Sequence, residues 1–359
     1  MQKLPLVGTV AIVLGAIALT LGLFKQLSSV IAPTFLAVNL LITAYPLYRW
    51  LDRRRVPRLL SATATGLVMF LILVIGMGAL VWCGTAMVSS LQGYNSQFMS
   101  LYRQAINLLA SIGFDEMALL AQLKSVSPTS VIDVVGNVVS EISGATGVLL
   151  VVLICMAFMV FDLPSVAKRL AITDRLHPSF THSLEAFAGG IRRYWLVTTV
   201  FGLIVAVLDG VVLLLVGVPL PLVWVILSFI TNYIPNIGFV LGLLPPALLA
   251  LFERGPWEAL IVVVAYSVLN FVIQSIIQPK FTGDAVGVTP VVSFLSLLLW
   301  TVIFGPLGAL LALPLTLMVK SLLLDNDPKA RWVGALIAAD PDTVDTSDCD
   351  DLKPNTSGA

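Results

Sequence analysis

Amide side chains occur at regular spacing within a long apolar stretch of the chain. Asn270, Gln274 and Gln278 are each four residues apart, so a helix would place all three on one face. An amide face cannot contact lipid without a large cost, so it either bonds to a neighbouring helix or lines a path for a polar solute. Asn232 and Asn236 lie in the preceding apolar run. Taken together, these amides favour a polar path through the protein.

A single carboxylate lies inside another apolar run. Asp209 stands within GLIVAVLDGVVLLLVGV, and a charge at membrane depth costs roughly 2.5–3.5 kcal/mol on the insertion scale. Such a residue faces the helix bundle, a hydrogen-bond donor or water, and it could bind a proton or a cation. The alternative is a position near the membrane surface, because Asp209 lies about ten residues from the outer end of its span at ~1.5 Å per residue. Asp209 is therefore a candidate coupling site, with the interfacial alternative left open.

Catalytic and metal-binding patterns are not expected among the remaining residues. No glycine-rich loop precedes a Lys-Ser/Thr pair, and no nucleophile–base pair stands out. His177 and His182 have no carboxylate placed for a metal site, which predicts solvated loop histidines. Cys83, Cys155 and Cys349 lie far apart and predict neither a disulfide framework nor a zinc site. We therefore expect a protein that is not an enzyme and that uses no catalytic residues, metal or cofactor.

The composition places most of the chain in lipid. Of the 359 residues, 58% are hydrophobic and 11% are charged, and the mean hydropathy is +1.00. Soluble domains carry about 25% charged residues, so a soluble protein of this composition could not cover its surface. The formal net charge is +0, which gives no reason to expect a nucleic-acid partner. We predict an all-α polytopic membrane protein whose main partner is the lipid bilayer.

Residues 1–88 are predicted to form three transmembrane helices. A spanning helix needs about 20 apolar residues, and Leu6–Phe24, Leu27–Tyr48 and Leu59–Val88 fit that requirement. The first run is too long for the usual core of a signal peptide, so we interpret it as a retained helix. A cluster of arginines follows the second span, and the positive-inside rule then places both this turn and the N-terminus in the cytoplasm (Arg49, Arg53, Arg54, Arg55 and Arg58).

The next two segments are predicted to lie on opposite sides of the membrane. Residues 89–144 are mixed in polarity, carry few basic residues and keep a helical apolar spacing in two stretches. They predict an extracytoplasmic amphipathic helical segment. Residues 145–194 are predicted to hold a fourth span, about Ala145–Phe161, and then a basic cytoplasmic loop. An interfacial helix over Glu185–Tyr194 would end that loop.

Residues 195–324 are predicted to form a transport core with broken helices. A fifth span runs from Trp195 to about Val218, and an ordinary span occupies Trp257–Gln278. The runs Pro221–Phe252 and Val286–Leu324 are long for one straight helix and short for two complete spans. They contain helix-breaking residues (Pro235, Gly305, Pro306, Gly308 and Pro314). Irregular backbone survives at membrane depth only where protein or water satisfies it, so these breaks would line a cavity or move.

Two counts of the spans are compatible with this pattern. If each broken run is one kinked span, the protein has eight spans. If each is a hairpin, the span between them reverses direction, but the C-terminus stays in the cytoplasm. We expect about eight transmembrane helices, and residues 325–359 form a polar, acidic tail that we predict to be cytoplasmic and disordered.

Three motifs, in this order, resemble the autoinducer-2 exporter (AI-2E) family, also called the PerM family. They are NYIPNIGFVLGLLPPALLAL, QSIIQPKFTGDAVGVTPVVSFLSLLLW and GPLGALLALPLTLMVK, within about Arg192–Leu324. The resemblance implies a transport protein of the bacterial inner membrane with about eight spans, cytoplasmic termini and a homo-oligomeric, pentameric assembly. Family members are linked to export of the quorum-sensing furanone autoinducer-2, and some to sodium–proton antiport.

The resemblance also carries over to particular residues. It implies that Pro235, Asn236 and Gly238 form the family's Pro-x-x-Gly break and that Gln278 opens its Gln-Pro turn. By the same resemblance, Gly305, Gly308 and Pro314 fall on the motif of the last segment. Asp209 is not expected from the family pattern.

The leading hypothesis is a secondary or facilitative exporter of a small polar solute such as the autoinducer-2 signal. Its path would be lined by seven residues (Asn232, Pro235, Asn236, Gly238, Asn270, Gln274 and Gln278). The second hypothesis is a cation–proton antiporter that binds protons or Na⁺ at Asp209. The third is a non-transporting membrane scaffold that holds a partner through residues 89–144.

Overall fold

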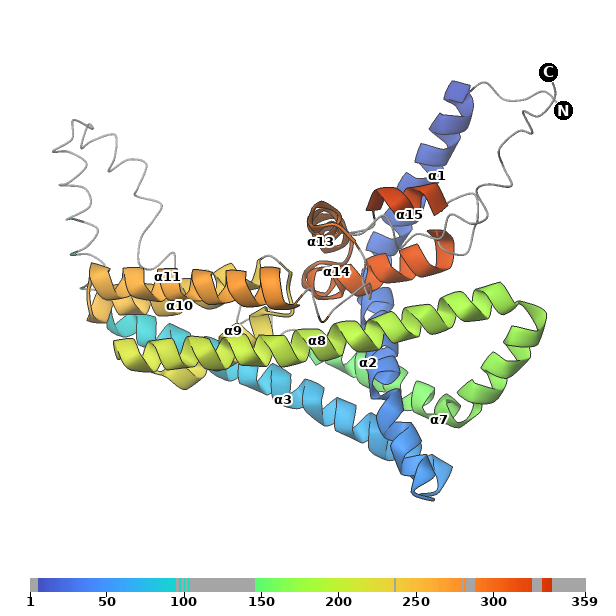
Figure 1. Cartoon of the computed structure of the whole chain (residues 1–359), viewed down its shortest axis with the longest axis horizontal. Coiled ribbons are helices and arrows are strands. Elements are labelled where there is room, and N and C mark those ends of the chain that lie inside the picture. The colour runs from blue at the N-terminus through green and yellow to red at the C-terminus, as the bar shows by residue number, and fades with distance from the viewer. Residues whose placement is uncertain are drawn as a thin grey trace. The chain divides into compact units, whose positions relative to one another are not determined.

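The computed structural model is helical throughout its regular elements (Figure 1). It describes residues 6–94, 97, 100, 103, 146–235, 237–278, 281, 288–324 and 331–337. Most of the predicted extracytoplasmic segment 89–144 lies outside these residues, as do Asn236 and most of the predicted tail.

The helices group into two compact units, each built from separated parts of the sequence. Unit 1 contains Met1–Phe70, Val148–Val197 and Pro279–Ala359, and unit 2 contains Leu71–Gly147 and Thr198–Gln278. Two long helices, α3 (Arg58–Gly93) and α8 (Pro178–Val216), contribute residues to both units.

Unit 1 combines the predicted N-terminal spans with the last broken run. Its elements include α1 (Leu6–Gln26), α2 (Ser28–Arg53), α7 (Thr146–Leu176), α13 (Pro290–Phe304), α14 (Pro306–Val319), the π-helix η3 (Lys320–Leu324) and α15 (Arg331–Ile337). α1 packs against α2 and α13, and α2 packs against α13 and α14. Phe24 of α1 stacks on Phe304 of α13, with ring centroids 6.3 Å apart. The broken run of unit 1 is therefore held by the first two spans.

The last broken run is a helical hairpin. α13 and α14 are antiparallel, since Ser296 donates a hydrogen bond to the carbonyl oxygen of Ala312 at 3.0 Å while Gly308 faces Trp300. Gly305 makes the turn with φ 64° and ψ −145°, a conformation that other L residues rarely adopt. A Cβ atom on Gly308 would lie 1.8 Å from the carbonyl oxygen of Trp300. The two arms can approach this closely only because residue 308 is glycine.

Unit 2 contains the first broken run and the helices around it. That run forms α9 (Pro221–Thr231) and α10 (Gly238–Glu253), and α11 (Pro256–Asn270) continues into the π-helix η1 (Phe271–Ile277). α10 packs against both α9 and α11, and it lies beside α11 in Figure 1. The C-terminal parts of α3 and α8 complete the unit.

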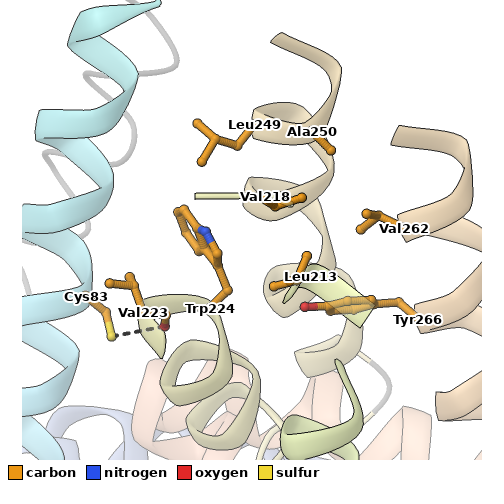
Figure 2. Close-up of a cluster of buried hydrophobic side chains, with 9 residues drawn as sticks. All are labelled: Cys83, Leu213, Val218, Val223, Trp224, Leu249, Ala250, Val262 and Tyr266. Carbon is orange, nitrogen blue, oxygen red and sulfur yellow. Dashed lines mark hydrogen bonds between the residues drawn. The ribbon is translucent and has the colours of Figure 1, made fainter. Parts of the chain in front are cut away.

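A buried apolar cluster joins the helices of unit 2 (Figure 2). Its largest members are Trp224 of α9 and Tyr266 of α11. Its other members come from α3, α8, the α8–α9 connection, α9, α10 and α11: Cys83, Leu213, Val218, Val223, Leu249, Ala250 and Val262. The Cys83 thiol donates to the carbonyl oxygen of Val223 at 3.4 Å, which links α3 to α9. Because lipid is as apolar as these side chains, the cluster acts through close packing rather than through exclusion of water.

The fold confirms the prediction of an all-α polytopic membrane protein. Five described helices are long and apolar enough to cross a membrane, namely Ser28–Arg53, Arg58–Ser90, Gly147–Leu176, Pro178–Val216 and Pro256–Ile277. The shorter apolar helices α9 and α10 contact each other, as do α13 and α14. Of the two counts of the spans, the fold thus favours the one in which both broken runs are hairpins and the span between them reverses direction.

Three local predictions are corrected by the fold. α7 continues to Leu176, so Lys168 and Arg169 lie on a helix and not in a loop. Glu185–Tyr194 is helical as predicted and belongs to the first part of α8, but His182 lies exposed on that helix rather than in a loop. α15 is helical within the tail that was predicted to be disordered. Charge alone does not end a helix, because Lys, Arg and Glu are good helix formers, and the apolar residues of α15 allow it to pack.

We predict that Gly308→Ala destabilises the hairpin of unit 1. The added methyl group must displace the backbone at Trp300, and overpacking of this kind typically costs about 1–3 kcal/mol. The unfolding temperature of the purified protein in detergent measures the effect. Gly15→Ala is the matched control, because nothing lies within 4 Å of the Cβ atom that it adds. Equal unfolding temperatures for the two variants would contradict the close contact between α13 and α14.

Candidate functional site

The turn between α9 and α10 folds the first broken run back on itself. The chain leaves α9 at Thr231, turns through Pro235 and enters α10 at Gly238. A Cβ atom on Gly238 would lie 1.8 Å from the carbonyl oxygen of Thr231, and one on Gly242 would lie 3.2 Å from the Cα atom of Ser228. Residues that come later in α10 face residues that come earlier in α9, so the two helices are antiparallel. Gly238 and Gly242 permit the close approach that their spacing predicted.

Polar contacts fix α9 and its turn against α8. Ser228 Oγ donates to Asp209 Oδ2 at 2.7 Å, Asn232 Nδ2 donates to the carbonyl oxygen of Gly202 at 3.4 Å, and the hydroxyl groups of Thr199 and Tyr233 are 2.8 Å apart. The partners on α8 move toward its N-terminus as α9 advances, so α9 runs antiparallel to α8. α9 is therefore bonded to α8 as well as packed on α10.

Three amide side chains meet at the end of α9, and we call them the amide cluster: Asn232, Asn270 and Gln274. Gln274 Nε2 donates to Asn232 Oδ1 at 3.0 Å and to Asn270 Oδ1 at 2.9 Å. Asn270 Nδ2 donates to the carbonyl oxygen of Tyr266 at 2.9 Å. Because Asn232 also bonds to Gly202, the amide cluster connects α8, the end of α9 and the junction of α11 with η1. Three of the predicted path residues thus lie together.

The π-helix η1 changes the register of the predicted amide face. The backbone N–H of Gln278 bonds to the carbonyl oxygen of Ile273, five residues earlier. This wider turn rotates the residues that follow Asn270 away from the spacing of a regular α-helix. Asn270 and Gln274 still meet in the amide cluster. Gln278 follows the π-helix, and sequence spacing could not reveal this change because it assumed 3.6 residues per turn throughout.

The amide cluster keeps unused hydrogen-bonding capacity. Gln274 Nε2 donates both of its protons, whereas its Oε1 accepts no hydrogen bond from the described residues. Asn232 and Asn270 each donate one of their two amide protons. Among the described residues, two N–H donors and one carbonyl acceptor of the amide cluster therefore have no partner. Asn232 and Gln274 are half-buried, whereas Asn270 is buried.

Asp209 lies on α8 apart from the amide cluster. Its side chain is completely buried, although it is ~10 Å along the helix axis from the end of α8 at Val216. Its Oδ1 atom and the hydroxyl group of Tyr266 are both buried without a hydrogen-bond partner in the described part of the chain. Packing by neighbouring helices, and not depth alone, therefore shields this carboxylate.

Two interactions that were not predicted from the sequence lie at the open end of the α9–α10 hairpin, where α9 begins and α10 ends. Arg254 donates from Nε and Nη2 to the carbonyl oxygen of Gly217, at 3.1 and 3.0 Å. The Tyr94 hydroxyl donates to Glu253 Oε1. This hydrogen bond, together with burial and the negative charge of Glu253, raises the pKa of Tyr94 to about 12. The polar sequence Glu-Arg-Gly-Pro between two apolar helices could have indicated these interactions.

The other predicted site residues are divided between the units. Pro235 lies in the α9–α10 turn of unit 2, whereas Asn236 lies outside the described residues. The predicted broken-helix residues belong to the α13–α14 hairpin of unit 1 (Gly305, Pro306, Gly308 and Pro314). Within the residues that the structure describes, no group of three or more His, Cys, Asp or Glu side chains could hold a metal ion.

Long apolar helices, hairpins built from broken helices and buried amides define a helical, multi-pass membrane protein with polar groups inside an apolar bundle. Residues 9–325 match the family described as "AI-2E family transporter", and the chain belongs to that family. The resemblance found in the sequence motifs is thereby confirmed, and it extends to nearly the whole chain.

Two relatives from Escherichia coli (strain K12) match over most of their lengths. The AI-2 transport protein TqsA is 27% identical over 314 residues, which cover 87% of this chain and 90% of TqsA. YhhT is 28% identical over 309 residues, which cover 86% of this chain and 88% of YhhT. A shorter match, to YrrI of Bacillus subtilis (strain 168), is 30% identical over 122 residues. Family and relatives support a membrane transporter.

We predict that Asn232 and Gln274 are energetically coupled. Asn232→Ala and Gln274→Ala each break the bond between η1 and the end of α9, so the double variant should lose less stability than the sum of the two. A coupling free energy of about 1 kcal/mol is expected from one hydrogen bond. Denaturant unfolding of the four proteins in detergent measures it. Asn232→Ala with Thr85→Ala is the control pair, since Thr85 bonds to the backbone of its own helix. Additive losses in both pairs would contradict the amide cluster.

Proposed function

We propose that this protein is a secondary or facilitative exporter of a small polar solute, such as the autoinducer-2 quorum-sensing signal. The observation that carries the proposal is the amide cluster, which joins α8, α9 and η1 and keeps two donors and one acceptor unused. Membership of the AI-2E transporter family supports a transport role. The name of TqsA, a relative at 27% identity, supports autoinducer-2 as the first solute to test.

The chemistry of the amide cluster suits an uncharged, polyhydroxylated solute. Amide groups donate and accept hydrogen bonds without a net charge, so they can replace the water around hydroxyl groups without attracting counterions. A charged solute would need a compensating charge, and the amide cluster itself contains none. We infer that the path includes Asn232, Asn270 and Gln274 and continues through Pro235, Asn236, Gly238 and Gln278.

The α9–α10 turn is the part of the path that we expect to move. Pro235 cannot donate a backbone hydrogen bond, and Asn232 and Tyr233 hold the turn to α8 through side chains. Broken helices of this kind supply transporters with irregular backbone next to a solute. A small shift of the turn would exchange hydrogen bonds within the amide cluster for hydrogen bonds to the solute.

We infer that the protein acts in the bacterial inner membrane with both termini in the cytoplasm. The arginines at 49–58 favour this orientation by the positive-inside rule. With α1 entering from the cytoplasm, the ends of α3 and α8 both fall on the extracytoplasmic side. The bonds from Tyr94 to Glu253 and from Arg254 to Gly217 agree, because they bring the ends of α3, α8 and α10 together. Homo-oligomeric assembly, as a pentamer, is proposed from the family resemblance alone.

A second candidate function is cation–proton antiport, and Asp209 is the observation that favours it. A completely buried carboxylate with an unpartnered oxygen is a suitable proton or cation ligand. If antiport is the function, Asp209→Asn abolishes pH-dependent Na⁺ flux in proteoliposomes, while Glu258→Gln, at the start of α11, leaves it in place. Unchanged Na⁺ flux in Asp209→Asn would exclude this candidate.

We predict that Gln274→Leu lowers efflux of autoinducer-2 from proteoliposomes at least tenfold while assembly stays intact. The variant removes one acceptor from the path and leaves Asn232 and Asn270 without their shared donor, and about 1.4 kcal/mol corresponds to tenfold. Ser267→Ala is the control on the same span, because the Ser267 hydroxyl bonds only to the backbone of its own helix. Normal efflux in a folded Gln274→Leu protein would remove Gln274 from the path. A folded wild-type protein that transports no solute would favour the scaffold hypothesis.

A further inference from the structure

Next to the contact between Asp209 and Ser228, α8 and α9 approach each other closely. Next to Asp209, a Cβ atom on Gly210 would lie 2.3 Å from Val225 Cγ2 and 3.7 Å from Val225 Cβ. The backbones of α8 and α9 can be this close because residue 210 is glycine. Any loosening of the Ser228–Asp209 hydrogen bond would therefore be transmitted directly to α9, the first arm of the hairpin.

The surroundings of Asp209 contain few groups that could balance its charge. Ser228 of α9 occupies Oδ2, and Oδ1 has no partner among the described residues. Tyr266 of α11 lies in the same buried cluster as Leu213, and its hydroxyl group has no partner among the described residues. Figure 2 shows Tyr266 reaching toward Leu213, which lies one helical turn beyond Asp209 on the same face of α8.

The charged groups among the described residues of unit 2 have other partners or positions. On α10, Glu253 accepts from Tyr94 and the adjacent Arg254 bonds to Gly217, all at the open end of the hairpin. On α3, the Cys83 thiol is bonded to the backbone of α9. The ion pairs of the described residues are Arg58–Asp52 and Arg169–Asp162, and neither includes Asp209. No cation of the described chain therefore holds Asp209 in its charged form.

We propose that Asp209 is a proton-binding site and that its protonation state sets how firmly α9 is held against α8. In the charged form, the described residues give the carboxylate one hydrogen bond, from Ser228, and burial of an ion costs more than one charge-assisted hydrogen bond returns. Separation of α9 from α8 would let water reach the carboxylate, so the charged form favours the released state. Proton binding removes the buried charge and leaves a neutral hydrogen bond to Ser228. The protonated site therefore holds α9 more firmly.

The consequence for transport rests on the function proposed above, because α9 ends at the amide cluster. Asn232 follows α9 directly and carries the bonds to Gly202 and Gln274. A proton at Asp209 would thus regulate the path without contacting the solute. The proton site and the helix contact can be tested in the purified protein with no solute present, so their failure is distinct from a failure of the export proposal.

Disulfide formation between α8 and α9 tests the proposal. In the full chain, with Cys83, Cys155 and Cys349 replaced by alanine, Gly210→Cys and Val225→Cys place two thiols at a Cβ separation that a disulfide requires. The matched control pair is Gly66→Cys with Val160→Cys, between α3 and α7. Its Cβ-to-Cβ distance is also 3.7 Å, and its Cβ-to-Cγ2 distance is 2.5 Å. The ratio of the two oxidation rates removes the ordinary pH dependence of thiol chemistry.

We expect this ratio to rise about five- to tenfold from alkaline to acidic buffer, as the buried charge is removed. Asp209→Asn, which mimics the protonated acid, should give the high ratio at every pH. A ratio that does not change with pH, or that changes equally in Asp209→Asn, would overturn the proposal. If Asp209→Asn does not fold, Ser228→Ala takes its place. That variant keeps the carboxylate but removes its donor, so its ratio in alkaline buffer should be lower than that of the protein with Ser228. An unchanged ratio in alkaline buffer would contradict the role of the Ser228 bond.

Discussion

Polar groups buried within apolar helices need partners from the protein itself, and the arrangement of unit 2 depends on this requirement. Asn232 satisfies it in two directions, because it donates to Gly202 on α8 and accepts from Gln274 on η1. Ser228 donates a hydrogen bond to one oxygen of Asp209 and so provides a partner for that buried group. In lipid, an unmade hydrogen bond cannot be replaced by water, so these few contacts decide where the hairpin lies. Apolar packing then fills the remaining space but does not specify a single register.

Glycine allows the hairpins to form once the polar contacts have set their direction. Gly238 and Gly308 occupy equivalent places, each just past the turn of its hairpin and each against a carbonyl oxygen of the first arm. In both cases an added Cβ atom would lie 1.8 Å from that oxygen. Close approach lets two short helices pack as one compact element, so neither arm has to span the membrane alone. The amide cluster at the end of α9 follows from this geometry, because the turn holds Asn232 near η1.

The sequence predicted the elements of the fold better than the connections between them. Runs of apolar residues located the long helices, and Pro235 and Gly305 located both breaks, because spanning length and helix breakers are local properties. Whether a break is a kink or a hairpin depends on contacts between the arms, such as Ser296 with Ala312, which no local pattern reveals. Among the site residues, the four-residue spacing correctly joined Asn270 to Gln274. The π-helix alters the turn before Gln278, so the position of Gln278 relative to Asn270 is not the one that a regular α-helix gives. The sequence pattern around Asp209 also could not identify its partner, because Ser228 is brought to Asp209 by the folding of α9 onto α8.

We propose that the amide cluster of unit 2 serves the passage of a small polar solute. The decisive experiment is efflux of autoinducer-2 from proteoliposomes that contain the wild-type protein, compared with protein-free vesicles, with and without an imposed pH gradient. We expect efflux above the protein-free rate, with a response to the gradient that reflects the proton at Asp209. An efflux rate equal to that of protein-free vesicles, under both conditions and with correctly assembled protein, would contradict the proposed export of this signal.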